Sequence, residues 1–371
     1  MMGKRTAGLV AAIALLGACS APGLDGEPAA SSRSASSPDP VQVDACPNDT
    51  AAVALPEPSG TTGVDPRTIS GPATASVSDV VVPITQNAVQ QLPVIVESCD
   101  GTSVTVTDTT RIVTADLYGT IGEIVFSLGL GDRVVGRDSS MGFAQAAQVD
   151  VVTPGGHQLN AEAILALDPS VVLTDTSIGP PEVIEQLRAS GVPVIFFNES
   201  RTLGGVPSHI RAVAGALGVP EEGERLVERV QAEIAESLTM VPADGEPLRA
   251  TFLYIRGGAG VYLMAGPGSG ADALIQAIGA IDVGTDIGLV AEYTPLTSEA
   301  LIAAEPDVII MMTGGLASVD GVDGLLEIPG VAQTPAGQSR RVIDMEDTDL
   351  LSFGPRAGAT IRAIVEAVYQ P

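Results

Sequence analysis

Two short stretches of this 371-residue chain carry side chains that are able to bind iron. His157 follows two glycines in the stretch Thr-Pro-Gly-Gly-His, and it is one of only two histidines in the sequence. Tyr254, one of five tyrosines, stands two residues before Arg256 and a Gly-Gly pair. Residues two apart on a strand share one face, so this tyrosine and arginine emerge together. Imidazole and phenolate are both iron ligands, and a neighbouring cation favours the phenolate.

Each of these residues also has an ordinary explanation. A histidine in a Gly-rich loop is often a solvated loop residue, and a tyrosine on a strand reflects β-propensity. The Gly-rich run at residues 266–270 lacks both a Lys-Ser/Thr pair and a G-x-G-x-x-G frame, which argues against a phosphate-binding loop. The interpretation therefore depends on the elements that position these side chains.

From about residue 104 the sequence alternates between short apolar runs and amphipathic stretches, which is typical of an α/β layer with a parallel sheet. We predict strands at 110–113, 134–136, 171–173 and 194–197 and helices at 120–128, 161–167 and 181–190.

The same unit occurs twice. Residues 161–173 match residues 298–310 at a constant offset of 137, with a glutamate, an apolar stripe, a proline and a strand in the same places. Between the two copies, residues 221–238 place apolar side chains at four-residue spacing, which predicts a long amphipathic helix. The predicted fold class is α/β, with two similar lobes joined by one long rigid helix and a ligand cleft between them. The boundaries are an N-terminal lobe at 104–220, a connecting helix at 221–240 and a C-terminal lobe at 241–371.

The N-terminal segment is that of an exported protein. Residues 1–18 combine two basic residues with a short apolar run, which predicts a signal peptide too short to span a membrane. The end of this run, Leu-Gly-Ala-Cys, resembles a bacterial lipobox and implies that Cys19 carries the lipid anchor. Residues 19–40 are rich in Ser, Ala and Pro, a composition that predicts a flexible tether.

Two further cysteines, Cys46 and Cys99, fall in the extension at 41–103, which also contains a strand-like run at residues 80–82. In an oxidising compartment we expect these cysteines to pair. No Cys-x-x-Cys or Cys/His cluster indicates zinc.

The charge of the chain excludes one class of partner. The sequence has 45 acidic and 18 basic residues, a formal net charge of −27, and this balance disfavours nucleic acid. Apolar residues make up 45% of the sequence, enough for a sizeable core.

These features together resemble the substrate-binding lipoproteins of ABC importers for iron-siderophores, cobalamin and haem, over about residues 104–371. The stretches around His157 and Tyr254 closely resemble those of actinobacterial haem-uptake lipoproteins. The resemblance implies a class III periplasmic-binding-protein-like fold, with His157 and Tyr254 as axial ligands of ferric haem and Arg256 supporting the tyrosinate or a propionate. It also implies that Glu162 and Glu299 dock the permease dimer, which works with its ATPase.

We therefore expect a monomeric haem-binding protein on the outer face of the cytoplasmic membrane, attached only through its lipid. A ferric siderophore or a corrinoid remains an alternative ligand. A secreted α/β enzyme is disfavoured because the chain lacks a Gly-x-Ser-x-Gly motif and has only two histidines. His157 must be neutral to bind iron, so we expect haem to be lost as the pH falls. Four arginines are unranked candidates for the propionates: Arg111, Arg133, Arg137 and Arg201.

Overall fold

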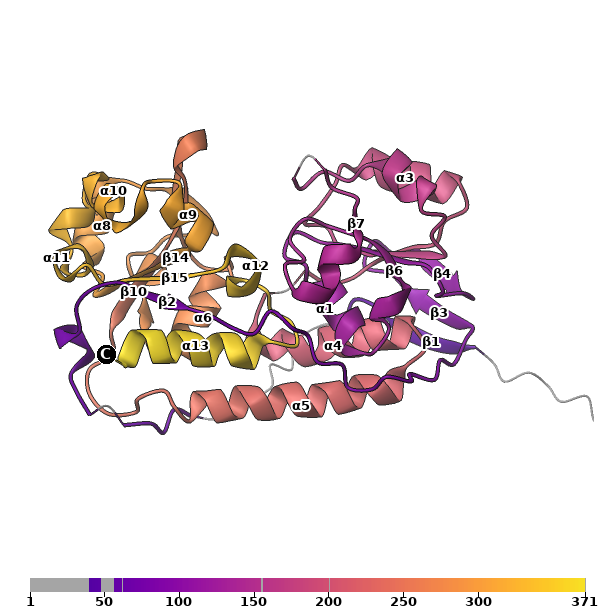
Figure 1. Ribbon diagram of the computed structural model, residues 1–371, viewed down its shortest axis with the longest axis horizontal. Coiled ribbons are helices and arrows are strands. Elements are labelled where there is room, and N and C mark those ends of the chain that lie inside the picture. Colours follow the sequence, from indigo (N-terminus) through magenta and orange to yellow (C-terminus); the bar gives the residue numbers. More distant parts are fainter. Residues whose placement is uncertain (1–39, 48–56, 62, 155, 200, 371) are drawn as a thin grey trace, which may run out of the picture. The chain divides into compact units, whose positions relative to one another are not determined.

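The computed structural model describes residues 40–47, 57–61, 63–154, 156–199 and 201–370. The predicted signal peptide, the anchor residue Cys19 and nearly all of the tether lie outside these residues. Within the described part of the chain, no helix is both long and apolar enough to cross a lipid bilayer. The fold class is confirmed: residues 40–371 contain two α/β lobes, each built on its own sheet (Figure 1).

The N-terminal lobe has a five-stranded parallel sheet in the order β7-β6-β5-β8-β9. Its two central strands are buried along their whole length, as expected for a parallel sheet covered on both faces. Successive strands are added to one side of β5 up to β7 and to its other side from β8 onward, and such a switch in strand order opens a crevice at the carboxyl ends of the strands. The strands are β5 (Ile112–Ala115), β6 (Val134–Arg137), β7 (Asp150–Val151), β8 (Val171–Thr174) and β9 (Val194–Phe196). The helices are α1 (Thr120–Ser127), α2 (Ala161–Ala166), α3 (Pro181–Ala189) and α4 (Val206–Ala216).

The C-terminal lobe has a mixed seven-stranded sheet whose main path is β13-β11-β10-β14-β15-β2, with β12 paired to β10. The hairpin of β10 and β11 is antiparallel, whereas β10, β14, β15 and β2 run parallel. The strands are β2 (Ala73–Ala75), β10 (Arg249–Arg256), β11 (Val261–Ala265), β12 (Ile281–Asp282), β13 (Tyr293–Pro295), β14 (Val308–Met312) and β15 (Val342–Met345). The helices are α6 (Ala271–Ala277), α7 (Val283–Asp286), α8 (Ser298–Ala304), α9 (Thr313–Ala317), α10 (Gly321–Glu327), α11 (Pro335–Ser339), α12 (Asp347–Leu350) and α13 (Ala357–Tyr369).

One long helix, α5 (Pro220–Leu238), runs between the lobes beside α13 (Figure 1). Its buried stripe includes Leu226, Val230 and Ile234, the residues whose spacing predicted the helix. At Gly358 the two helices approach so closely that a Cβ would meet the backbone of Glu233 at 2.8 Å. This contact fixes α5 against the C-terminal lobe.

The sequence repeat extends to the backbone. Asn160 caps α2 by accepting from the Ala163 amide at 2.9 Å, and Thr297, offset by 137, caps α8 in the same way. Each of these helices is followed by an acidic residue with positive φ, at 48° for Asp168 and 45° for Glu305. A proline comes next in both copies, and a buried strand follows. The repeat is therefore one helix–turn–strand unit used once in each lobe.

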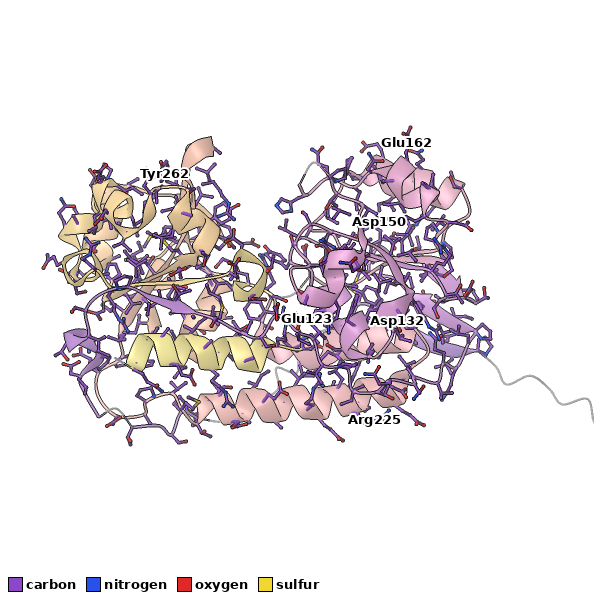
Figure 2. All side chains as sticks on the ribbon, in the orientation of Figure 1. Glu123, Asp132, Asp150, Glu162, Arg225 and Tyr262 are labelled. Atoms are coloured by element: carbon purple, nitrogen blue, oxygen red, sulfur yellow. A yellow bond between two sulfur atoms is a disulfide. The ribbon has the colours of Figure 1, made fainter. Side chains whose placement is uncertain are left out.

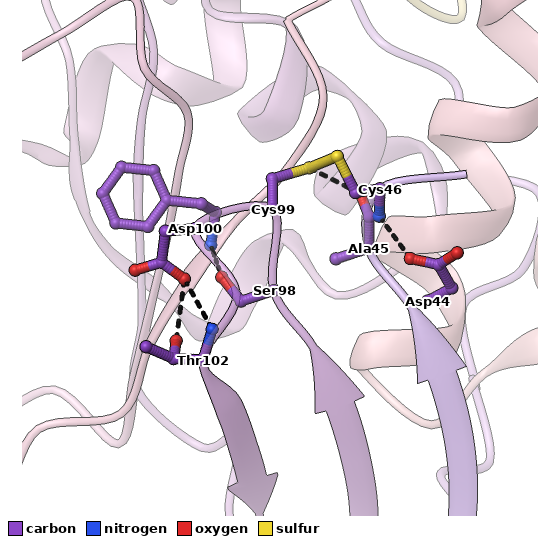
Figure 3. Close-up of a disulfide and its surroundings, with 8 residues drawn as sticks. Asp44, Ala45, Cys46, Ser98, Cys99, Asp100 and Thr102 are labelled. Atoms are coloured by element: carbon purple, nitrogen blue, oxygen red, sulfur yellow. Dashed lines mark hydrogen bonds between the residues drawn. A yellow bond between two sulfur atoms is a disulfide. The ribbon is translucent and has the colours of Figure 1, made fainter. Parts of the chain in front are cut away.

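The extension before the N-terminal lobe contacts both lobes. Its strands β1 (Val41–Asp44), β3 (Val94–Glu97) and β4 (Ser103–Val106) form a three-stranded sheet, and a disulfide joins Cys46 to Cys99 with 4.9 Å between the Cα atoms (Figure 3). Between the two cysteines, β2 pairs with β15 of the C-terminal lobe. Six 3-10 turns complete the described elements: Pro66–Thr68, Gly131–Arg133, Ala144–Gln148, Leu203–Gly205, Gly257–Ala259 and Val331–Gln333.

The prediction of a strand at residues 80–82 is wrong. This run is irregular, and Val80 and Val82 are exposed while only Val81 is buried. The side chain of Gln145 bonds both the amide and the carbonyl of Val81, at 3.1 and 2.6 Å, in the way that a partner strand would. The Gln145 side chain thus fills the hydrogen-bonding capacity of the Val81 backbone, which would otherwise be available to pair with a strand.

Candidate functional site

A cavity of about 400 Å³ lies between the carboxyl ends of strands from the two lobes. The N-terminal lobe contributes residues that follow β5, β6 and β7, and the C-terminal lobe contributes residues of β10, β11, β13, β14 and the segment after β15. Its lining residues are Leu117, Tyr118, Ser139, Ser140, His157, Tyr254, Arg256, Leu263, Tyr293, Met312, Asp347, Thr348, Leu351 and Ser352. The two predicted iron ligands therefore line one cavity from opposite lobes.

His157 lies in the loop between β7 and α2, with its side chain exposed. Gly156 before it has φ of 98°, a conformation that favours glycine. The Gly156 carbonyl accepts from the Ser139 hydroxyl at 3.0 Å, and the Leu159 amide donates to the carbonyl of Gly179 at 2.8 Å. These bonds hold the loop on both sides of the histidine.

Tyr254 and Arg256 share one face at the end of β10. The guanidinium carbon of Arg256 lies 4.7 Å from the centre of the Tyr254 ring. Nη2 of Arg256 forms an ion pair with Oδ2 of Asp347 at 2.7 Å, and the other oxygen of Asp347 accepts from the Gly314 amide at 2.8 Å. The ion pair with Asp347 thus holds the guanidinium of Arg256 over the ring of Tyr254.

Three of the five tyrosines line this cavity: Tyr118, Tyr254 and Tyr293. The rings of Tyr254 and Tyr293 meet edge to face with centroids 5.8 Å apart. Burial is the main reason that the pKa values of Tyr118 and Tyr293 are raised above that of a free tyrosine. These two phenols therefore keep their protons at neutral pH, and the Tyr118 hydroxyl accepts a hydrogen bond from Nη1 of Arg201.

Behind the N-terminal wall, an aspartate directly follows each of three neighbouring strands: Asp116 after β5, Asp138 after β6 and Asp175 after β8. All three are buried, and backbone amides donate to each carboxylate. Burial, together with the charge of Asp116, raises the pKa of Asp138 to about 8 and that of Asp175 to about 7. The cluster therefore holds protons at neutral pH.

A buried ion-pair group joins the lobes beside the cavity. Glu123 of α1 lies on the side of the N-terminal lobe that faces the C-terminal lobe (Figure 2) and is only 2% exposed. Its carboxylate accepts from the Arg356 amide at 2.8 Å and pairs with the Arg356 guanidinium at 3.2 Å. The same guanidinium pairs with Asp349 at 2.9 Å.

The other predicted site residues lie apart from the cavity. Glu162 and Glu299 occupy the first turns of α2 and α8, and both are exposed; Figure 2 shows Glu162 on the outer edge of its lobe. Of the candidate propionate partners, only Arg201 contacts a cavity residue, Tyr118. The other three bond elsewhere: Arg111 to Leu167 and Asp168, Arg133 to Gln90 and Thr109, and Arg137 to Ala146 and Asp138.

Comparison with known proteins gives matches to one protein family, to solved structures and to curated sequences. The family of periplasmic binding proteins matches residues 115–348. The heme binding protein HmuT, known from a crystal structure, is 43% identical in sequence to this chain. The two structures superpose with a TM-score of 0.79, and the match covers 83% of this chain and 100% of HmuT.

Two sequence relatives are more distant. The cobalamin-binding protein of Halobacterium salinarum is 26% identical over 71% of this chain and 71% of its own length. The uncharacterised ABC transporter substrate-binding lipoprotein YvrC of Bacillus subtilis is 25% identical over 67% of this chain and 76% of its own length.

Proposed function

The chain belongs to the periplasmic binding protein family, and on this basis we propose that it captures ferric haem outside the cytoplasm and delivers it to an ABC importer. One observation carries the proposal: His157 of the N-terminal lobe and Tyr254 of the C-terminal lobe line the same cavity. An imidazole and a phenolate from opposite sides can ligate the two axial positions of a haem iron. The chain acts as a binding protein and not as an enzyme.

The walls of the cavity suit a flat apolar macrocycle. Leu117, Leu263 and Leu351 supply apolar surface, and Tyr118 and Tyr293 supply aromatic rings. Sites of this kind are mostly apolar, with a few polar groups that fix the orientation of the ligand. A volume of about 400 Å³ lies within the usual range for a small-molecule pocket.

The similar heme binding protein supports the choice of residues. HmuT has also been crystallised as variants in which one histidine, one tyrosine or one arginine is replaced by alanine. The tyrosine and the arginine stand two positions apart in that chain, as Tyr254 and Arg256 do here.

The chemistry of the C-terminal wall favours the ferric state. A phenolate binds ferric iron through its negative charge, and Arg256 on the Tyr254 ring adds a cation that stabilises that charge. Neutral His157 would complete the coordination. The iron supplies the Lewis acid, and the chain supplies the two ligands and the apolar surroundings.

A corrinoid is the strongest competing ligand, because a cobalamin-binding protein is among the relatives. A titration with hemin, cyanocobalamin or a ferric siderophore separates these ligands. We expect a Soret band to form with hemin at one equivalent and to weaken and shift in His157→Ala and in Tyr254→Ala. A hemin titration unchanged in both variants, or binding of cyanocobalamin alone, would refute the proposal.

We further propose that the mature protein is a monomer anchored through lipidated Cys19 to the outer face of the cytoplasmic membrane. Glu162 and Glu299 stand at matched positions of the two lobes, exposed on α2 and α8. Two carboxylates placed in this way suit a pseudo-symmetric permease dimer that presents a cation to each lobe.

A further inference from the structure

Arg201 connects the two lobes next to Tyr118, a residue that lines the cavity. It follows β9 of the N-terminal lobe, its guanidinium carbon lies 4.7 Å from the ring centre of Tyr118, and its Nη1 donates to the Tyr118 hydroxyl. Its Nη2 reaches the C-terminal lobe, where it pairs with Oε2 of Glu292 at 3.0 Å and donates to the carbonyl of Gly268 at 3.3 Å. The arginine side chain is only 15% exposed.

The Gly-rich turn of the C-terminal lobe is shaped around this arginine. The carboxylate of Asp272 accepts from the amides of Gly268 and Gly270, at 2.9 and 3.0 Å, and so fixes the turn. At Gly270 a Cβ would lie 3.2 Å from the Cβ of Arg201 and 2.9 Å from the ring of Phe353. Glycine at this position therefore lets the backbone of one lobe approach the Arg201 side chain of the other.

The carboxylate partner of Arg201 is more exposed than the partners of Arg256 and Arg356. Glu292 is 58% exposed, whereas Asp347, the partner of Arg256, is 31% exposed. Arg356 pairs with two carboxylates that are 2% and 14% exposed. Because more than half of the Glu292 side chain is exposed, water solvates its carboxylate well once the carboxylate is released.

We propose that Arg201 binds a carboxylate of the ligand and that Glu292 occupies this position until the ligand enters. The proposal rests on the proposed function, because haem carries two propionates and enters a chain with a net charge of −27. Glu292 is next to Tyr293 in the chain, and Tyr118 stacks on Arg201, so two cavity residues flank the ion pair. Exchange of one carboxylate for another leaves the charge of Arg201 compensated in both states.

Hemin and hemin dimethyl ester test this exchange, since they share the iron and the macrocycle and differ in the two carboxylates. We would measure both dissociation constants for the wild type, Arg201→Gln and Glu292→Gln. Matched controls are Arg211→Gln and Glu224→Gln, which alter an exposed ion pair between α4 and α5. The ratio of the two constants within one variant does not depend on the fraction of folded protein.

We expect the wild type to prefer hemin to its ester, Arg201→Gln to reduce this preference about tenfold or more, and Glu292→Gln to increase it. The controls should keep the wild-type ratio. An unchanged ratio in Arg201→Gln, with the Soret band intact, would overturn the role of Arg201 and leave the proposed function standing. Absence of any hemin binding by the wild type would instead refute the proposed function.

Discussion

The guanidinium of Arg256 lies over the ring of Tyr254, 4.7 Å from its centre, and is held there by the carboxylate of Asp347. Cation–π contacts of this kind contribute about 0.5–2 kcal/mol, and the same cation stabilises a phenolate. We therefore predict that Arg256→Gln lowers the affinity for hemin about threefold to thirtyfold. Affinity for metal-free protoporphyrin should change little, because no phenolate is needed. Fluorescence quenching measures both ligands, and an equal loss for both would contradict a role at the iron.

The sequence alone was sufficient for the parts of this site that depend on local periodicity. Alternation along β10 predicted that Tyr254 and Arg256 share a face, and the repeat at an offset of 137 predicted two lobes. Asp347 was missed because it lies 91 positions from Arg256 in the chain, and only the packing of α12 against α9 brings the two side chains together. No short-range pattern carries that information.

Two other features were missed for different reasons. Strand β2 joins the C-terminal sheet although it precedes the N-terminal lobe in the chain, and its three residues give no periodic signal. The buried aspartates did leave a signal, since one acid directly follows each of three apolar strands. An acid at the end of one strand is unremarkable, and only the strand order shows that Asp116, Asp138 and Asp175 meet.

These aspartates predict an unusual dependence of stability on pH. Their raised pKa values mean that the folded state binds protons which the unfolded chain releases above about pH 4. The resulting stabilisation is complete below the unfolded pKa, decreases as the pH rises above about 4, and is fully lost once the pH has passed the folded values of about 7 to 8. In urea unfolding, the free energy of unfolding of the ligand-free wild type should fall between about pH 5.5 and 8.5. We expect Asp138→Asn to make this fall smaller by about 3 kcal/mol. Parallel curves for variant and wild type would show that Asp138 is ionised in the folded protein.

Arg356 is expected to be a stability determinant. It compensates Glu123 and Asp349, which are 2% and 14% exposed, and it links α1 to the start of α13. Arg356→Met keeps much of the side-chain volume but leaves the buried carboxylate of Glu123 and the partly buried one of Asp349 without a cation, a change that costs about 3–5 kcal/mol. Arg211→Met, which breaks an exposed pair with Glu224, should cost less than about 1 kcal/mol. Similar unfolding midpoints for the two variants would contradict this assignment.

The disulfide is expected to stabilise both lobes together. Cys46 and Cys99 are 53 positions apart, and the chain between them includes β2, which pairs with the C-terminal sheet. Closing a loop of this length reduces the entropy of the unfolded chain by an equivalent of about 2–5 kcal/mol. We predict that reductant lowers the urea midpoint of the wild type and has no effect on a variant in which both cysteines are serine. A wild-type midpoint that reductant leaves unchanged would show that the bridge adds no stability.

The last prediction separates capture of haem from its delivery. Glu162 and Glu299 lie on exposed first turns of α2 and α8, and neither lines the cavity. Glu162→Ala and Glu299→Ala should therefore leave the hemin dissociation constant unchanged and reduce haem-dependent ATPase stimulation of the reconstituted importer severalfold each. Glu182→Ala is the matched control, because Glu182 is also an exposed acid in the first turn of a helix, α3. If all three variants stimulate the importer equally, the matched pair of glutamates reflects only the favourable placement of an acid at a helix N-terminus.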